Sequence, residues 1–170
     1  TAVEAINQLP IRGLSITAPL KSTCLTWLQQ SDTLTQQSQA CNTINIHQGI
    51  WYGINTDGPA AIDCLQPWQH PRIRPCHVLA IGPTARAIAC AMQQQGWPVT
   101  LYGRDLQQCR AWRQQTGIRC RPLNRFRDLA ENSIVVNTIP GQTDHFPIHL
   151  AEHFHLDMIF LDCCYQPIPS

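Results

Sequence analysis

The fold of this chain is decided by residues 77–105, which read HVLAIGPTARAIACAMQQQGWPVTLYGRD. The apolar run at 77–81 predicts a buried strand, and TARAIACAMQQQ at 84–95 predicts a helix that Gly96 closes. A second strand is predicted at 99–103. Strands that are apolar on both faces and alternate with helices indicate a parallel sheet covered on both sides.

The residues after 103 continue this alternation. Asp105 is expected to be the N-cap of a helix at 105–115. Short apolar strands are then predicted at 117–120, 133–137 and 158–162. We therefore expect a Rossmann-like, dinucleotide-binding lobe over residues 67–170.

The residues before 67 predict a smaller α/β lobe. In chain order, its elements are a helix at 2–9, a strand at 13–17, a helix at 20–30, strands at 42–47 and 50–54, and a helix at 59–65. Gln48-Gly49 between the paired strands is typical of a hairpin turn. The proline-rich stretch 66–75 is interpreted as a linker. The fold class is thus α/β with two lobes, the first over residues 1–66.

Composition narrows the class of protein. The chain has 170 residues, with 44% hydrophobic and 14% charged, so it can bury a core. Its formal net charge of +1 gives no electrostatic reason to expect nucleic acid or an anionic membrane as a partner. No apolar run approaches the roughly 20 residues that a membrane-spanning helix needs.

The nine cysteines predict reduced thiols in a cytoplasmic protein, because their number is odd and no C-x-x-C pair occurs. Cys64, Cys76 and Cys90 lie in apolar runs, where free cysteine behaves as a small hydrophobic residue. Three histidines are spaced by four residues around Pro147, namely His145, His149 and His153. No cysteine or carboxylate completes a ligand set there, so we expect no metal site.

Two features of the second lobe point to a dinucleotide. Gly82 follows a strand and precedes a helix, where a pyrophosphate binds, although an ordinary turn explains it equally well. Arg104 stands at the end of the next strand, where an arginine meets the 2′-phosphate of NADP. Asp105 could instead accept from the ribose of NAD or cap the following helix. The arginine favours NADP over NAD.

The first lobe carries a set of polar residues at strand ends, which are Thr17, Lys21, Asn42 and Asp57. A lysine beside an aspartate can hold a hydroxyl and move its proton, and nearby amide and hydroxyl groups can bond a polyol. Ordinary turn chemistry explains each residue singly. Lys21 is nevertheless the only lysine among 12 basic residues.

The order of these segments resembles the shikimate dehydrogenase family over nearly the whole chain. The segments are ITAPLK (16–21), CNTI (41–44), GINTDG (53–58), VLAIG-TARAIA (78–89), LYGRD (101–105), VVNTIPG (135–141) and LDCCYQP (161–167). The resemblance implies a substrate lobe and an NADP lobe with the active site between them. It also implies reversible NADP-linked oxidation of shikimate to 3-dehydroshikimate, or of a similar polyol acid such as quinate.

Roles are carried over by position from the family. Lys21 and Asp57 match its catalytic pair, Thr17, Asn42 and Asp57 match substrate contacts, and Tyr165 matches a tyrosine that lines the cleft. The positions that match the cofactor site are Gly82, Pro83, Thr84, Ala85, Arg104, Asp105, Thr138 and Ile139.

The chain departs from the family in four respects. The opening strand with its paired serines and the C-terminal helices are missing from this stretch. The glycine-rich loop is shortened to Gly82-Pro83-Thr84, and the family's N-R-T becomes Gly103-Arg104-Asp105. Two functions are therefore expected. The favoured one is an NADP-dependent dehydrogenase, and the alternative is a non-catalytic relative that acts as a small-molecule sensor or partner-binding module.

Overall fold

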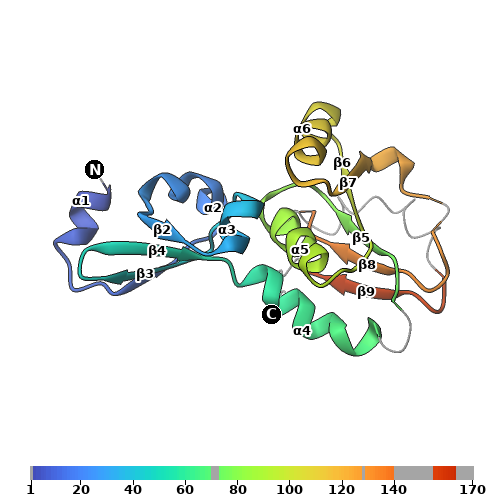
Figure 1. Ribbon diagram of the computed structural model, residues 1–170, viewed down its shortest axis with the longest axis horizontal. Coiled ribbons are helices and arrows are strands. Elements are labelled where there is room, and N and C mark those ends of the chain that lie inside the picture. The colour runs from blue at the N-terminus through green and yellow to red at the C-terminus, as the bar shows by residue number, and fades with distance from the viewer. Residues whose placement is uncertain (1, 70–72, 128, 140–154, 164–170) are drawn as a thin grey trace, which may run out of the picture.

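The computed structural model describes residues 2–69, 73–127, 129–139 and 155–163. These residues form two sheets side by side, with helices packed between them (Figure 1). The prediction of an α/β fold with two sheets is confirmed.

The first sheet is mixed. Its strands are β1 (Gly13–Ser15), β2 (Gln30–Ser31), β3 (Thr43–His47) and β4 (Ile50–Ile54), in the order β1-β3-β4-β2. β3 is antiparallel to both β1 and β4, and β2 is parallel to β4. Gln48 and Gly49 join β3 to β4 with φ angles of 49° and 79°, so the predicted hairpin turn is confirmed.

The second sheet is entirely parallel. Its strands are β5 (Cys76–Leu79), β6 (Val99–Gly103), β7 (Arg119–Pro122), β8 (Ile134–Asn137) and β9 (Ile159–Asp162), in the order β7-β6-β5-β8-β9. Every neighbouring pair runs in the same direction. The reversal of strand order beside β5 is the place where open α/β sheets bind ligands.

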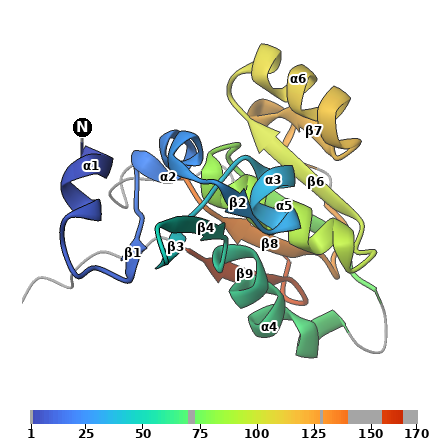
Figure 2. The same ribbon diagram turned by 60° about the vertical axis from the view of Figure 1, so that its left-hand side comes forward.

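The helices connect and cover these sheets (Figures 1 and 2). In chain order they are α1 (Ala2–Asn7), α2 (Leu20–Thr23), the 3₁₀ helix η1 (Cys24–Trp27), α3 (Thr33–Ser38), α4 (Asp57–Gln69), α5 (Pro83–Gln94), α6 (Leu106–Thr116) and the 3₁₀ helix η2 (Leu123–Arg125). Among the described residues, no helix is long and apolar enough to cross a membrane.

Three local expectations need correction. The helix expected at 20–30 is broken into α2 and η1, and Gln30 already belongs to β2. α4 continues to Gln69 with Pro67 inside it, so the irregular stretch after it is shorter than predicted. The helix persists because Leu65 and Gln69 are buried on its inner face. Cys64 is exposed and does not join the core.

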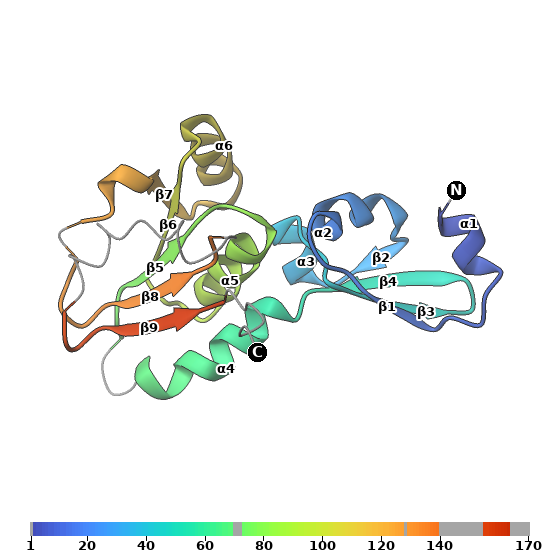
Figure 3. The ribbon, with the colours of Figure 1, turned by 180° about the vertical axis from the view of Figure 1, so that it is seen from behind.

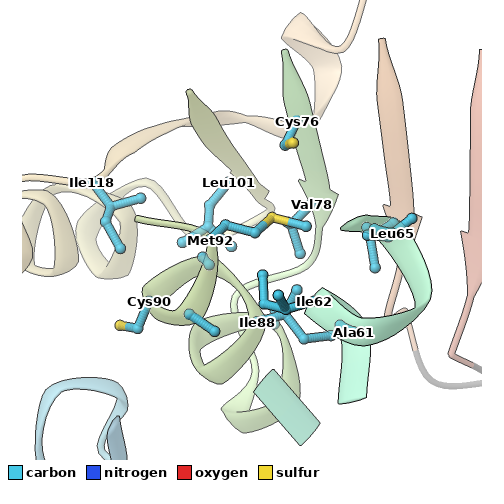
Figure 4. Packing of buried hydrophobic residues seen from close by; sticks show 14 of the residues in the cluster. Ala61, Ile62, Leu65, Cys76, Val78, Ile88, Cys90, Met92, Leu101 and Ile118 are labelled. Atoms are coloured by element: carbon cyan, nitrogen blue, oxygen red, sulfur yellow. The ribbon is translucent and has the colours of Figure 1, made fainter. Parts of the chain in front are cut away.

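The largest core lies on one face of the second sheet. It combines strand residues such as Val78 and Leu101 with Ile88 and Met92 of α5. Figure 4 shows that Ile62 and Leu65 of α4 point into the same cluster. α5 is thus buried between the parallel sheet and α4.

The opposite face of the second sheet carries a separate cluster, with Leu79, Tyr102, Phe126, Leu129 and Val135 at its centre. A third cluster under the first sheet is built around Ile16, Ile44 and Trp51. Seen from behind, β3 and β4 extend away from the parallel sheet (Figure 3). The half that carries the first sheet (β1–β4) and the half that carries the second sheet (β5–β9) therefore contact each other through helices rather than through strands.

The turn between β5 and α5 consists of Ala80, Ile81 and Gly82. Ala80 has a φ of 92°, which L-residues other than glycine rarely adopt. Its N–H donates to the Tyr102 carbonyl at 2.9 Å, which holds it beside β6. The turn that replaces the longer glycine-rich loop thus includes a non-glycine residue with a positive φ.

Candidate active site

Lys21 and Asp57 are brought together by the topology of the first sheet. β1 and β4 are both antiparallel to β3, so their carboxyl ends lie at the same edge. α2 begins after β1 and carries Lys21, and α4 begins after β4 with Asp57. Lys21 Nζ donates to Asp57 Oδ2 at 2.6 Å, and the two side chains are 15% and 20% exposed. The two side chains are therefore mostly shielded from water but remain partly accessible to solvent.

The Asp57 carboxylate is held from its other side by Asn42. Asn42 Nδ2 donates to Asp57 Oδ1 at 2.8 Å and to Thr56 Oγ1 at 2.8 Å. Asn42 Oδ1 accepts from the Thr56 N–H at 2.9 Å. Asn55 Oδ1 accepts from the backbone N–H groups of Asp57 and Gly58 at 3.0 and 3.3 Å, which fixes the start of α4. The orientation of the carboxylate is therefore fixed by neighbouring amides.

Thr84 completes this network from the other half of the molecule. Its Oγ1 accepts from Lys21 Nζ at 3.0 Å and donates to Asp57 Oδ2 at 3.1 Å. Thr84 lies in the first turn of α5. Lys21, Asp57 and Thr84 thus form a closed triangle of hydrogen bonds that joins the two halves.

The backbone beneath Lys21 is tied to the sheet. The Cys41 N–H donates to the Lys21 carbonyl at 2.7 Å, and the Cys24 thiol lies 3.6 Å from the same oxygen. Burial raises the pKa of Cys24 to about 12, so this thiol stays neutral at physiological pH. Cys24 therefore acts as a thiol donor to the Lys21 carbonyl and does not supply a thiolate.

Arg86 fastens the start of α5 to the elements around Lys21. Its Nη2 donates to Ser22 Oγ at 2.9 Å and to the Gln39 carbonyl at 3.1 Å. Its guanidinium lies 5.3 Å from the centroid of the Trp112 ring. Burial lowers the pKa of Arg86, and the cation is retained by these partners.

The amino end of α5 has room and donors for an anion. The first helical N–H with an acceptor inside α5 is that of Arg86, which bonds the Gly82 carbonyl at 3.0 Å. The N–H groups of Thr84 and Ala85 precede it, and Pro83 has none. A Cβ placed on Gly82 would meet no atom of the described residues within 4 Å, so they leave the space beside the turn open. These features fit the pyrophosphate of a dinucleotide.

Other residues expected at the cofactor site lie at the same edge of the parallel sheet. Thr138, directly after β8, bonds the Leu79 carbonyl through its N–H at 3.2 Å and its hydroxyl at 2.7 Å. The Ile139 N–H donates to Asn137 Oδ1 at 3.1 Å. This segment therefore stands beside the turn that carries Gly82.

Arg104 and Asp105 follow β6 at that edge and are both exposed. Asp105 Oδ1 accepts from the N–H groups of Gln107 and Gln108 at 2.8 and 3.1 Å. The prediction of Asp105 as a helix cap is confirmed. Its carboxylate is committed to α6, and the guanidinium of Arg104 is available for a phosphate.

Not every expected site residue joins the network. Thr17 is exposed before α2, and its carbonyl accepts from the Leu20 N–H at 2.9 Å, but no hydrogen bond links its side chain to the Lys21–Asp57 pair within the described ranges. Tyr165 lies outside the described residues, as do the three histidines His145, His149 and His153. No group of three metal-ligating residues occurs in the part of the chain that the structure describes.

Sequence reasoning missed the supporting roles of Asn55, Thr56 and Arg86. Asn55 and Thr56 belong to the GINTDG segment, which predicts polar residues or a turn at the strand end, but it does not predict that they hold Asn42 and the start of α4. Arg86 lies 64 residues from Ser22, so no local pattern predicts their contact.

The chain is similar in sequence to known proteins over most of its length. No family model matches the chain. A protein of Thermus thermophilus named shikimate dehydrogenase (NADP(+)) is 30% identical over 159 residues, which are 92% of this chain and 59% of the relative. A protein of the same name from Ignicoccus hospitalis is 26% identical over 92% of this chain. The chain spans about three fifths of the length of these relatives.

Solved structures agree with the sequence comparison. Shikimate 5-dehydrogenase from Thermus thermophilus, in complex with shikimate, superposes with a TM-score of 0.80 at 28% identity. The match covers 99% of this chain and 63% of that one. The same enzyme in complex with NADP(H) and shikimate gives a TM-score of 0.80 at 26% identity. Over the residues that it spans, this chain therefore resembles shikimate dehydrogenases in both sequence and fold.

Proposed function

We propose that this protein is an NADP-dependent shikimate dehydrogenase that interconverts shikimate and 3-dehydroshikimate. Residues 1–66 would hold the polyol acid and residues 67–170 the dinucleotide. The observation that carries the proposal is the 2.6 Å contact between Lys21 Nζ and Asp57 Oδ2, made between two helix starts at one sheet edge. We place the reaction in the cytoplasm, because the described cysteines are free thiols.

The chemistry follows from the hydrogen-bond capacity of the pair. Oxidation of a secondary alcohol removes one proton from oxygen and one hydride from carbon. Two of the three positions on Lys21 Nζ are directed to Asp57 and Thr84, which leaves the third for a substrate hydroxyl. Lys21 would take the hydroxyl proton as the carbonyl forms and return it in the reverse direction. Asp57 would orient the lysine and stabilise its charge.

The Asn42 side chain extends the same polar edge. Its amide already bonds Asp57 and Thr56, and Thr43 Oγ1 donates to Asn42 Oδ1 at 3.1 Å. These partners use both hydrogens of Nδ2 and both lone pairs of Oδ1, so Asn42 would bond a ring hydroxyl by exchanging one of them. Thr17 and Tyr165 are proposed to contact the same ligand because of their positions in the family pattern.

The fit of the second half supports the choice of cofactor. NADP⁺, when bound, supplies the hydride acceptor. The N–H groups of Thr84 and Ala85 would bond its pyrophosphate, with Gly82 and Pro83 forming the turn. Arg104 would neutralise the 2′-phosphate, and Thr138 and Ile139 would line the edge beside β8.

The test is Lys21→Met in the full chain, assayed by the absorbance of NADPH with shikimate and NADP⁺. Because proton transfer depends on Nζ, we expect turnover to fall by about 10²–10⁴-fold. Shikimate binding, measured by calorimetry, should change much less. Arg110→Met removes an exposed cation from α6 and should keep wild-type turnover.

The outcomes separate the candidate functions. Turnover by Lys21→Met at the wild-type rate contradicts the assignment of the lysine. Turnover with quinate but not shikimate replaces the substrate and keeps the residue roles. Tight binding of shikimate without any turnover by the wild-type chain contradicts the enzymatic proposal and identifies a small-molecule sensor.

A further inference from the structure

The hydroxyl of Thr84 is used in an unusual way for a threonine at a helix start. Threonine in a first turn commonly satisfies backbone N–H groups of its own helix. Here the N-cap is Gly82, no side chain in the described part of the chain caps α5, and Thr84 Oγ1 instead bonds Lys21 and Asp57. The hydroxyl therefore serves the neighbouring half of the molecule.

The direction of these hydrogen bonds is fixed by chemistry. An ionised carboxylate only accepts, so the single proton of Thr84 Oγ1 is directed to Asp57 Oδ2. The same oxygen can then only accept from Lys21 Nζ. This arrangement persists whether the lysine carries two or three protons, because Thr84 has no second proton to offer.

We propose that Thr84 is a positioning residue for Lys21. By holding one N–H of Nζ, it fixes which of the three bonding directions of that nitrogen exchanges a proton with a ligand hydroxyl. Asp57 Oδ2 and Thr84 Oγ1 are acceptors at 2.6 and 3.0 Å, and each holds one N–H in place. The remaining position then points in one direction, toward a ligand hydroxyl. Without Thr84, Lys21 keeps one acceptor among the described residues, and the amine rotates about its bond to Cε.

Lys21 needs this second hydrogen-bond acceptor because α2, the helix that carries it, is short. α2 has four residues, none of them buried, and it has no capping side chain from the residues that the structure describes. Lysine has a flexible four-carbon stem that costs about 2 kcal/mol of rotamer entropy to order. A point of support outside α2 is therefore required to hold Nζ.

α5 is a rigid source for that support. It has 12 residues, and seven of them are buried, including Ala85 and Ala87 beside Thr84. Arg86 bonds Ser22, the residue after Lys21, at 2.9 Å. A Cβ on Gly58 would lie 2.9 Å from the Ala87 carbonyl, so only glycine lets the start of α4 approach α5 so closely. The helix thus delivers the Thr84 hydroxyl to Asp57 and Lys21 with little freedom.

The test compares Thr84→Val, which keeps the branched shape and removes the hydroxyl, with Thr84→Ser, which keeps the hydroxyl. The first readout needs no activity. Lys21 is the only lysine, so ¹⁵N-lysine labelling gives a single ammonium signal whose hydrogens exchange with water. We expect exchange about tenfold faster in Thr84→Val, in line with the loss of one hydrogen bond to a charged group, and within about twofold of wild type in Thr84→Ser.

The second readout is kinetic and rests on the proposed function. kcat should fall by about tenfold in Thr84→Val and recover in Thr84→Ser, while KM for shikimate changes by less than about threefold. KM for NADP⁺ should also be retained, because valine keeps the backbone N–H. Thr116→Val removes a hydroxyl that bonds the Trp112 carbonyl at 2.8 Å, far along α6, and should leave both readouts unchanged.

The two proposals fail in different ways. Equal exchange rates in Thr84→Val, Thr84→Ser and wild type overturn the positioning role, whatever the substrate is. Faster exchange in Thr84→Val alone supports the role even where shikimate is not turned over, and that result contradicts only the proposed function. A parallel loss of kcat in both variants also overturns the positioning role, because the hydroxyl would not account for it.

Discussion

His77 provides a pH-dependent contribution to stability that can be worked out from its surroundings. The side chain extends from β5 onto the face of the sheet that carries Tyr102 and Phe126, with ring centroids at 5.7 and 6.2 Å. Its Nδ1 lies 3.2 Å from the Tyr102 hydroxyl, and its Nε2 is buried without a hydrogen-bond partner among the described residues. Burial, and then the nearby Arg121, lower the pKa of His77 to about 4.

The sign and size of the effect follow from linkage. The unfolded chain binds a proton at His77 near pH 6.5, and the folded chain binds it only near pH 4. Above pH 6.5, His77 therefore does not reduce the free energy of unfolding. Its titration lowers this free energy as the pH decreases from 6.5 to about 4, and has no further effect below about 4. The difference between the two pKa values corresponds to about 3 kcal/mol.

The assay is urea unfolding followed by tryptophan fluorescence between pH 7.5 and pH 4. His77→Gln removes the titrating ring and should lose about 3 kcal/mol less than wild type over this range. Tyr102→Phe keeps the histidine and the ring contacts, so it should retain the wild-type pH dependence. If wild type and His77→Gln lose the same free energy between these two pH values, the buried-histidine reasoning is refuted.

Two further predictions concern the cofactor edge and its turn. Asp105→Asn keeps a cap on α6 and removes a negative charge beside Arg104. Calorimetry should therefore show that NADP⁺ binds about two- to fivefold more tightly, while the affinity for NAD⁺ is unchanged. An equal change for both nucleotides would contradict the charge argument. Ala80→Gly relieves the φ of 92° and should stabilise the fold by about 1 kcal/mol in urea unfolding, and a lower unfolding midpoint would show that the backbone there is not strained.

The strands and the contact between Lys21 and Asp57 could be predicted because their signals are local or ordered along the chain. Apolar runs predicted the parallel sheet, and the resemblance placed Lys21, Asn42 and Asp57 together, as the hydrogen bonds among them do. The C-terminal boundary of α4 could not be predicted, because Pro67 is typical of a helix end. The helix continues past it because Leu65 and Gln69 are buried by tertiary contacts.

The role of Thr84 could not be predicted for a different reason. A lone threonine after Gly82-Pro83 reads as part of a phosphate-binding turn, and nothing nearby indicates a partner 63 residues earlier. The strain at Ala80 is likewise invisible in the sequence, because an alanine after a strand has no signature of a positive φ. The contacts of Thr84 arise only when the two halves pack around α5, and the conformation of Ala80 arises beside Tyr102 of β6.

The position of α5 also determines how the two halves can move. Gly58 of α4 is packed against Ala87 and Ala91, and Gln94 Nε2 donates to Gln37 Oε1 of α3 at 2.9 Å. A swing about the segment after α4 would tear these helices apart and expose the apolar core that they share. Small displacements of α5 along α3 and α4 keep that core covered, which is the behaviour of a shear interface. Any relative motion of the two sheets that keeps this core covered would thus be a sliding of helix on helix, and it would alter the distance between Thr84 and Lys21.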